Sequence, residues 1–485
     1  MEHNNLARLQ RNIVSCHLNL EQYQKAEEAV RDCIKYDPKN PYTHYLNFRV
    51  ALCNNHPNQA IGAIKQLSDS RFENEADCSF EPLEDAVTGL ISLAAQQAVE
   101  HTNQEIAIEA LEKLTEHSRD EKQLITTYRC LIRLRCTAKK EEGMEGADAQ
   151  KVFTYLKSAC NLLTDIILPD AESPTLKKEE TCNWFMKIAW NMALENSENC
   201  ELSHKFFSLC AEFCSLQEQD AASLGRQKTC LVMAAAALLQ TARDTLDLQE
   251  KAVLLEQVLQ LVKACREVYS QLSVTESSSN SDRAMVLLNL SEFEALGKLG
   301  RTTEMELFAK QVTSNPTIDL KTIETLAALA MEPPCQYKAL SERFLTVALI
   351  RHKETIPMNI TRCSKILHSL IQLSLGDGNC NDTEKMEEAW HHFSDALSLI
   401  HNSTEQLDYP EIEILWLMTK SWNTGIYAYG TGKPQIAMKW SSLSMKFLSQ
   451  LRDFKQSYEP KMQAMFEEVS TKLSDEDTIV IKKEP

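Results

Sequence analysis

The sequence predicts an all-α protein, a right-handed superhelical solenoid of tetratricopeptide-like helix pairs. The chain of 485 residues contains only 12 Gly and 14 Pro, fewer than turn-rich β folds and glycine-loop enzymes use. Apolar residues recur at helical spacing along most of the chain. Near the N-terminus a unit of two helices repeats after 34 residues, which is the period of the tetratricopeptide repeat.

The first repeat unit extends from residue 7 to residue 40. Leu20 closes its first helix and Tyr23 lies in the following turn. Ala26 is the small residue that the second helix needs at its closest crossing with the first. Pro38 ends the unit, because Pro has no backbone N–H and cannot continue a helix.

Two further units follow the first. Ala60 lies 34 residues after Ala26 and is the crossing residue of the second unit. Ala107 is the equivalent residue of a third unit, although its distance from Ala60 is 47 residues. We expect the additional residues in a loop around Ser68–Phe80.

A late unit restores the repeat pattern, with two small crossing residues twelve positions apart and a glycine in the turn. Its members are Trp422, Asn423, Gly425, Gly432, Ala437 and Trp440. A partial copy lies upstream at Trp190 and Asn191. Between these units the chain is helical but irregular, so these aromatic residues are predicted mainly as core residues between paired helices, with a peptide pocket as the alternative.

The repeat pattern divides the chain into four ranges. We expect N-terminal tetratricopeptide-like repeats over residues 1–138, irregular helical repeats over 139–382, and C-terminal repeats over 383–472. Residues 473–485 are expected to form a disordered tail. Four polar segments, 139–149, 169–180, 275–281 and 376–382, are predicted as loops between stacked helices.

Composition restricts the class of partner. The formal net charge of −18 disfavours direct binding to nucleic-acid phosphates. The 16 cysteines include no CxxC pair, which favours buried thiols in a reducing compartment. The N-terminus has no apolar signal segment and no run of about 18 apolar residues occurs. We therefore expect a nuclear or cytosolic protein without a membrane partner.

No catalytic, cofactor or metal motif is expected. The segment Gly430–Lys433 lacks the earlier glycine and the following Ser or Thr of a phosphate-binding loop. His391 and His392 are adjacent, so they point in different directions on a helix. Cys210 and Cys214 share a helical face, but no further ligand lies near them in the sequence. We predict no enzyme activity, no cofactor and no metal.

The C-terminal tail combines an acidic run with a short β-branched stretch, which can add a strand to the edge of another sheet. This is the form of a SUMO-interaction motif, and an overlapping apolar-Lys-any-acid pattern matches SUMO attachment. The tail residues concerned are Ile479, Val480, Ile481, Lys482 and Glu484. SUMO is therefore a candidate partner, with a plain disordered end as the alternative.

Two blocks resemble the tetratricopeptide scaffold family of meiotic crossover proteins. They are CNWFMKIAWNMALENSENCELSHKFF, from Cys182, and SWNTGIYAYGTGKPQIAMKWSSLSMKFL, which contains Trp422. The resemblance covers most of the chain and is strongest over residues 181–451. It implies a nuclear protein on meiotic chromosomes that binds recombination and chromosome-axis proteins and promotes crossovers and synapsis. It implies no catalytic residues. Family members are longer, so a short isoform or a fragment is expected.

The alternative function is a general tetratricopeptide adaptor or co-chaperone in the cytosol or nucleus. A co-chaperone that clamps acidic C-terminal tails needs Lys and Arg clustered on the first helices of its repeats. The first repeat offers Arg8 and Arg11, but the sequence shows no matching basic set in the second. This comparison disfavours the clamp.

Overall fold

The structure is a computed structural model of the chain. It describes residues 2–70, 83–137, 146–165, 174–275, 283–376, 383–402 and 409–464, together with 466, 467 and 470. Within these residues the regular elements are helices, and no strand occurs. None of the described helices is long and apolar enough to span a membrane. The prediction of an all-α array of helix pairs is confirmed.

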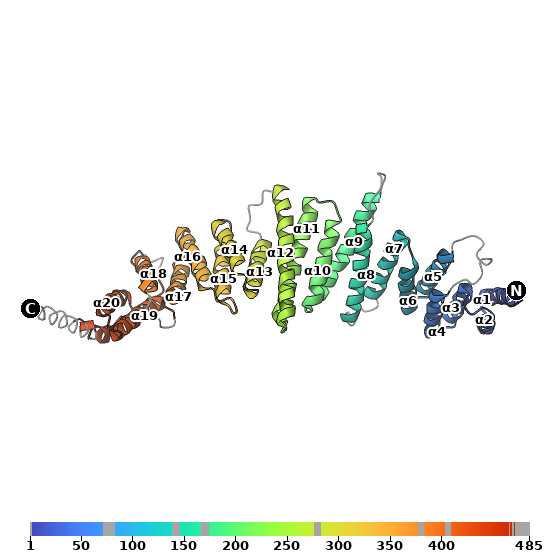
Figure 1. Ribbon diagram of the computed structural model, residues 1–485, viewed down its shortest axis with the longest axis horizontal. Helices are drawn as coiled ribbons and strands as arrows, with labels where there is room; N and C mark the ends of the chain where they lie inside the picture. The colour runs from blue at the N-terminus through green and yellow to red at the C-terminus, as the bar shows by residue number, and fades with distance from the viewer. Residues whose placement is uncertain are drawn as a thin grey trace, which may run out of the picture. The chain divides into compact units, whose positions relative to one another are not determined.

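From α1 to α10 and from α13 to α20 the helices follow one another as hairpins, each with an odd-numbered first helix and an even-numbered second helix (Figure 1). Their bounds are α1 Glu2–Asn19, α2 Tyr23–Tyr36, α3 Pro41–Cys53, α4 Pro57–Asp69, α5 Leu83–Glu100, α6 Gln104–His117, α7 Glu121–Thr137, α8 Gly146–Asp165, α9 Pro174–Glu195, α10 Cys200–Ser215, α11 Ala221–Asp244, α12 Leu248–Thr275, α13 Arg283–Lys298, α14 Thr302–Ser314, α15 Leu320–Met331, α16 Lys338–Glu354, α17 Ile360–Leu375, α18 Thr383–His401, α19 Glu411–Gly430 and α20 Pro434–Gln450.

Contacts divide the chain into two compact units. Unit 1 comprises Met1–Asp244 with Lys263–Ser277, and unit 2 comprises Thr245–Val262 with Ser278–Pro485. Helix α12 contributes to both units. These units are defined by contact, whereas the ranges predicted from the sequence are defined by how regular the repeat pattern is, so the two divisions have different boundaries.

A shared turn joins the two helices of several hairpins. Glu21, Asn55, Thr102, Gly300 and Gly432 each adopt a left-handed backbone conformation two residues before the second helix begins, with φ between 56° and 74°. In each turn the next amide donates to the carbonyl five residues earlier, at 2.9–3.0 Å. This hydrogen bond caps the first helix and reverses the chain. The turn repeats although its left-handed residue is glycine at only two positions.

The residue five positions after each left-handed residue is buried at the crossing of the two helices. These residues are Ala26, Ala60, Ala107, Met305 and Ala437, each with at most 1% of its surface exposed. Small side chains here allow two helices to approach closely. The sequence pattern predicts the four alanines at this position but not Met305, because methionine does not mark a close crossing.

Two predicted loops are shorter than expected. Helix α8 begins at Gly146, inside the predicted loop 139–149, and α9 begins at Pro174, inside 169–180. Polar residues predict loops in these segments, but the first turn of an exposed helix tolerates them. Pro also suits the first helical position, where its missing N–H has no helical partner. The loop expected around Ser68–Phe80 falls largely on residues 71–82, which lie outside the described residues.

Each unit has apolar clusters between its helices. In unit 1 one cluster joins α1, α2 and α3, and another extends from α3 to α7. In unit 2 a large cluster extends from α13 to α20 and includes Met462. Hairpins pack on their neighbours along the chain, as expected for stacked helical repeats.

Candidate functional site

Grooves open between consecutive first helices at three places in the described residues. Groove 1 lies between α1, α3 and α5, and groove 2 lies between α9 and α11, both within unit 1. Groove 3 lies between α15 and α17 over α16, within unit 2. Their volumes are about 450, 590 and 550 Å³ respectively. Grooves of this size accommodate several side chains of a partner.

Groove 1 is basic and aromatic, and none of the described residues that line it is acidic. Its lining residues are Arg8, Arg11, Asn12, Ser15, Tyr42, Tyr45, Leu46, Arg49 and Leu90. The residues come from three successive hairpins, so the groove exists only when these hairpins stack.

The arginines of groove 1 differ in their partners. Arg11 is buried, and its Nη1 donates to Asp37 Oδ2 at 2.9 Å and to Thr43 Oγ1 at 3.4 Å. Arg8 is exposed and Arg49 is half-buried, and neither forms an ion pair with another described residue. Two guanidinium groups of groove 1 therefore remain available to an external anion.

Arg49 also lies close enough to Tyr45 to act on its hydroxyl. Burial raises the pKa of Tyr45, and the guanidinium of Arg49 acts against this rise. Arg49 belongs to the first helix of the second hairpin, so this hairpin does contribute a basic residue beside Arg8. The sequence does not reveal Arg49 as part of a basic site, because the groove collects single residues from different hairpins.

Groove 2 is mostly apolar, with two cationic side chains at its margin. It is lined by Met186, Lys187, Trp190, Asn191, Ala222, Gly225, Arg226, Thr229 and Cys230. Trp190 is half-buried and packs edge-to-face on Phe207, with ring centroids 5.2 Å apart. Trp190 therefore packs in the hairpin and also lines groove 2, and its use as a peptide pocket stays a prediction.

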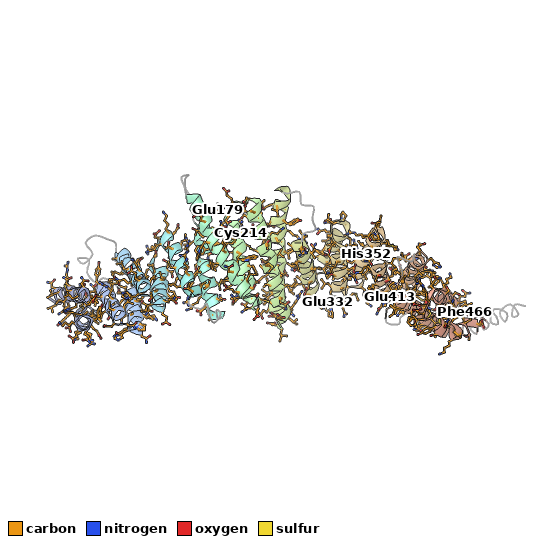
Figure 2. All side chains as sticks on the ribbon, turned by 180° about the vertical axis from the view of Figure 1, so that it is seen from behind. Glu179, Cys214, Glu332, His352, Glu413 and Phe466 are labelled. Atoms are coloured by element: carbon orange, nitrogen blue, oxygen red, sulfur yellow. The ribbon has the colours of Figure 1, made fainter. Side chains whose placement is uncertain are left out.

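Sulfur atoms lie beneath groove 2. The Cys210 thiol donates to the Met186 carbonyl at 3.5 Å. The thiol of Cys214, the α10 residue labelled in Figure 2, lies 3.6 Å from the Met186 sulfur. Hydrogen bonding with Cys230, followed by burial, raises the pKa of Cys214. Thiols held in the protonated form are weak nucleophiles. Among the described residues no cluster of His, Cys, Asp and Glu could hold a metal ion.

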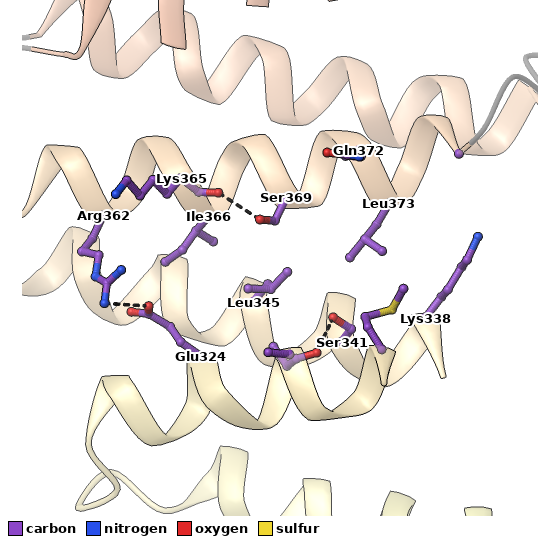
Figure 3. Close-up of a pocket in the computed structure, with 14 residues that line it drawn as sticks. Glu324, Lys338, Ser341, Leu345, Arg362, Lys365, Ile366, Ser369, Gln372 and Leu373 are labelled. Atoms are coloured by element: carbon purple, nitrogen blue, oxygen red, sulfur yellow. Dashed lines mark hydrogen bonds and ion pairs between the residues drawn. The ribbon is translucent and has the colours of Figure 1, made fainter. Parts of the chain in front are cut away.

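Groove 3 contains charges of both signs. Figure 3 shows Arg362 of α17 pointing across the groove to Glu324 of α15, at 3.5 Å. Glu324 is also 2.8 Å from Nε2 of the buried His352. On the floor, Ser341 donates to the Ala327 carbonyl at 2.9 Å. The acidic residue of groove 3 therefore already has internal partners.

The late repeat unit contains packing residues rather than a groove wall. Trp440 is 2% exposed and packs edge-to-face on Trp390 and Phe393. Trp422 packs partly buried against the same core, and Asn423 is exposed.

The remaining repeat residues occupy turns and crossings. A Cβ atom at Gly425 would lie 3.2 Å from the Ala437 carbonyl oxygen, so these two residues mark the crossing of α19 and α20. Gly432 lies in the turn between them. In the first hairpin Leu20 follows α1 and is exposed, Tyr23 is the first residue of α2, and Pro38 follows its end.

The predicted SUMO-related residues 479–482 and 484 lie outside the described residues, so SUMO binding remains a prediction.

No protein-family model matches the chain. Solved helical-repeat structures are similar to it at low identity. The Cut9–Hcn1 hetero-tetramer of the APC/C shares 11% identity over 95% of this chain and 96% of that chain, with a TM-score of 0.26. The Pseudomonas aeruginosa pilF protein shares 13% sequence identity over 50% of this chain and 93% of that chain, with a TM-score of 0.21. A Pyrococcus horikoshii signal-transduction ATPase with a tetratricopeptide-repeat sensor shares 14% sequence identity over 75% of this chain and 49% of that chain, with a TM-score of 0.20. Likeness at this level says nothing about what this chain binds.

Proposed function

We propose that this chain is a non-catalytic scaffold that binds other proteins through the grooves between its first helices. One observation carries the proposal: consecutive first helices leave open grooves at three places in the described residues. Stacked helix pairs leave such a surface on one side, and helical-repeat proteins use it to bind extended segments or helices of their partners.

Groove 2 has the composition of a protein-binding hot spot. The half-buried Trp190 lines the groove, the exposed Arg226 adds a cation that also donates to Gln217 at 3.3 Å, and the mostly buried Met186 lines it as well. Trp and Arg are enriched among the residues that contribute most to protein binding, and Met adapts to partners of different shape. The groove therefore suits an apolar side chain or a short helix of another protein.

The partners that we propose are meiotic recombination and chromosome-axis proteins, bound in the nucleus on meiotic chromosomes. The support is the sequence resemblance around residues 182–207 and 421–448. Its first block contributes Trp190 and Asn191 to groove 2, and its second block forms the α19–α20 hairpin. The resembling segments thus include a groove wall as well as core positions.

The test fills groove 2 without disturbing the helices. A Cβ atom at Gly225 meets no other atom within 4 Å, so Gly225→Phe directs an aromatic ring into the groove. Gly62→Phe is the matched control, because Gly62 is a helical glycine with equally open surroundings on a second helix. Both variants and the unaltered chain are expressed with an affinity tag in meiotic tissue.

We expect the unaltered chain and Gly62→Phe to enrich recombination or axis proteins in quantitative mass spectrometry. Gly225→Phe should lose at least one of them. Failure of the unaltered chain to enrich any such protein, together with its absence from meiotic chromosome spreads, would contradict the meiotic assignment. Enrichment of unrelated proteins that depends on groove 2 would instead support a general adaptor.

A further inference from the structure

We infer that a second apolar stripe on α1 binds the same stripe of a second copy of this chain. The stripe, here called the α1 seam, consists of Leu6, Leu9, Ile13, Cys16 and Leu20. None of these residues lines groove 1. The inference goes beyond the scaffold function, because a scaffold can bind partners through its grooves as a single chain.

Helix α1 is apolar on two faces. Its inner stripe is buried in the first hairpin, with at most 6% of each side chain exposed, at Ala7, Val14 and Leu18. A helix at the surface of a protein needs only one such stripe. The α1 seam lies on other residues and remains open to solvent: Leu6 is 41% exposed, Leu9 58% and Leu20 65%. Neighbouring exposed leucines mark a surface that binds another apolar surface.

The spacing of the α1 seam is that of a helix that packs along another helix. Its residues follow one another at steps of three, four, three and four positions, which is the a/d pattern of paired helices. Leu20 continues the helical register, because its amide donates to the Cys16 carbonyl at 3.0 Å. At 1.5 Å per residue the seam is about 21 Å long.

The positions that flank the α1 seam favour a second copy as its partner. In paired helices these positions usually carry charged residues that select the partner through ion pairs. In α1 they contain no Asp, Glu, Lys or Arg, and they are Asn5, Gln10, Asn12, His17 and Asn19. Residues 3–20 contain no acidic residue, although the chain has a formal net charge of −18. Two seams can therefore meet without repulsion between flanking side chains, whereas a helix with charged flanks finds no ion pair here.

A two-fold axis at Ile13 matches the α1 seam to itself. With the two α1 helices antiparallel, Leu6 of one copy faces Leu20 of the other, and Leu9 faces Cys16. Opposed helix dipoles favour this direction. The small Cys16 is the one seam residue that fills its place incompletely.

The size of the contact indicates how strong the dimer is. A standard interface buries about 800 Å² on each partner with 20–30 residues a side. Five seam and five flanking positions correspond to about 300–400 Å² on each copy. The dimer is therefore weak and depends on the concentration of the chain. It carries every groove twice, so a partner with two binding segments is held more tightly than either segment alone.

Sedimentation equilibrium of the full chain with a thiol reductant measures the average mass from about 1 to 100 μM. The seam variants are Leu9→Gln and Leu20→Gln. Leu307→Gln is the matched control, because Leu307 on α14 is 60% exposed and lies outside the seam. Cys16→Leu places a fourth leucine in the seam at a residue that is exposed. Circular dichroism compares the helix content of all variants.

We expect the average mass to rise with concentration from one chain to two. Each seam Leu→Gln variant should weaken the dimer about tenfold, because it removes an apolar contact from both copies. Leu307→Gln should leave the affinity unchanged. Cys16→Leu should strengthen the dimer about tenfold, a gain that loss of folding does not produce. Added salt should not weaken the dimer, since no ion pair holds it.

Four outcomes would overturn the inference: a single chain at every concentration, an equal effect of Leu307→Gln, no gain from Cys16→Leu, or a mass that rises past two chains. If the chain stays monomeric, the second copy is refuted, and a helix of another protein is then the occupant that fits the seam. Partner capture through groove 2 tests the scaffold function separately, so either result can fail without the other.

Discussion

Adding one methyl group at the crossing of α19 and α20 tests the helix-pair geometry directly. Gly425 lies where α19 meets α20, and a Cβ atom there would lie 2.8 Å from Ser441 Oγ and 3.2 Å from both the Ala437 carbonyl oxygen and the Ser441 amide nitrogen. The serine hydroxyl can rotate away, but the two backbone atoms cannot. Gly425→Ala therefore requires α19 and α20 to separate by a few tenths of an ångström.

Two opposing effects determine the free energy of unfolding of this hairpin. Crowding a well-packed helix contact costs about 1–3 kcal/mol. Ala in place of Gly inside a helix returns about 1 kcal/mol. Gly89→Ala supplies the second effect alone, because Gly89 lies inside α5 with no atom within 4 Å of the added Cβ. Relative to Gly89→Ala, Gly425→Ala should therefore lower the free energy of unfolding by about 1–3 kcal/mol.

Native-state hydrogen exchange measured by mass spectrometry resolves this difference locally, which matters because a chain of two units need not unfold in one step. Peptides from α19 and α20 should exchange faster in Gly425→Ala, whereas peptides from α5 should exchange more slowly in Gly89→Ala. A factor of ten in exchange corresponds to about 1.4 kcal/mol. Slower exchange of α19 and α20 in Gly425→Ala would refute the close crossing at this position.

Three further predictions concern the hairpin turns and buried polar groups. Thr102 has a left-handed backbone with φ 56°, so Thr102→Gly should stabilise unit 1 by about 1 kcal/mol in thermal unfolding, and a lower melting temperature would contradict this. Burial opposes ionisation of Glu112, but hydrogen bonds from Tyr155 and Arg135 outweigh it and lower its pKa. The stabilisation from ionised Glu112 should be complete above its ordinary pKa of 4.5 and lost as the pH falls through the lowered pKa. Arg135→Gln leaves the Tyr155 hydrogen bond in place and should weaken this pH dependence in acid unfolding curves. Burial raises the pKa of Cys33 to about 11, so iodoacetamide at pH 8 should label it slowly in the native chain and rapidly in urea, and equal rates would show that it is not buried.

The sequence predicted the helix pairs well where a small residue marks the crossing. Ala26, Ala60 and Ala107 were identified because a small side chain at a close approach is required whatever the rest of the repeat contains. Met305 occupies the same position in the α13–α14 hairpin but gave no signal. A flexible methionine can fill a wider crossing, so its hairpin was predicted as helices without being recognised as a repeat.

The shared turn was harder to predict than the helices. Glycine marks the left-handed residue at Gly432, but Glu21 and Thr102 adopt the same conformation. These residue types rarely adopt positive φ, so their identity gives no warning of the turn. Packing of the two helices on each side holds the backbone there, and this packing is visible only in the folded chain.

By itself, the sequence determined the all-α class and the pairing of helices, because helical periodicity and close crossings are local properties of the chain. Only the tertiary structure decided which side chains form grooves. Trp190 and Trp422 occupy the same place in the two similar sequence blocks, yet Trp190 lines groove 2 whereas Trp422 packs against the core of unit 2. Arg8 and Arg49 are distant in sequence and meet in groove 1 because successive hairpins stack. Stacking determines which stripe of each first helix stays uncovered, and that depends on the neighbouring hairpins rather than on the helix alone.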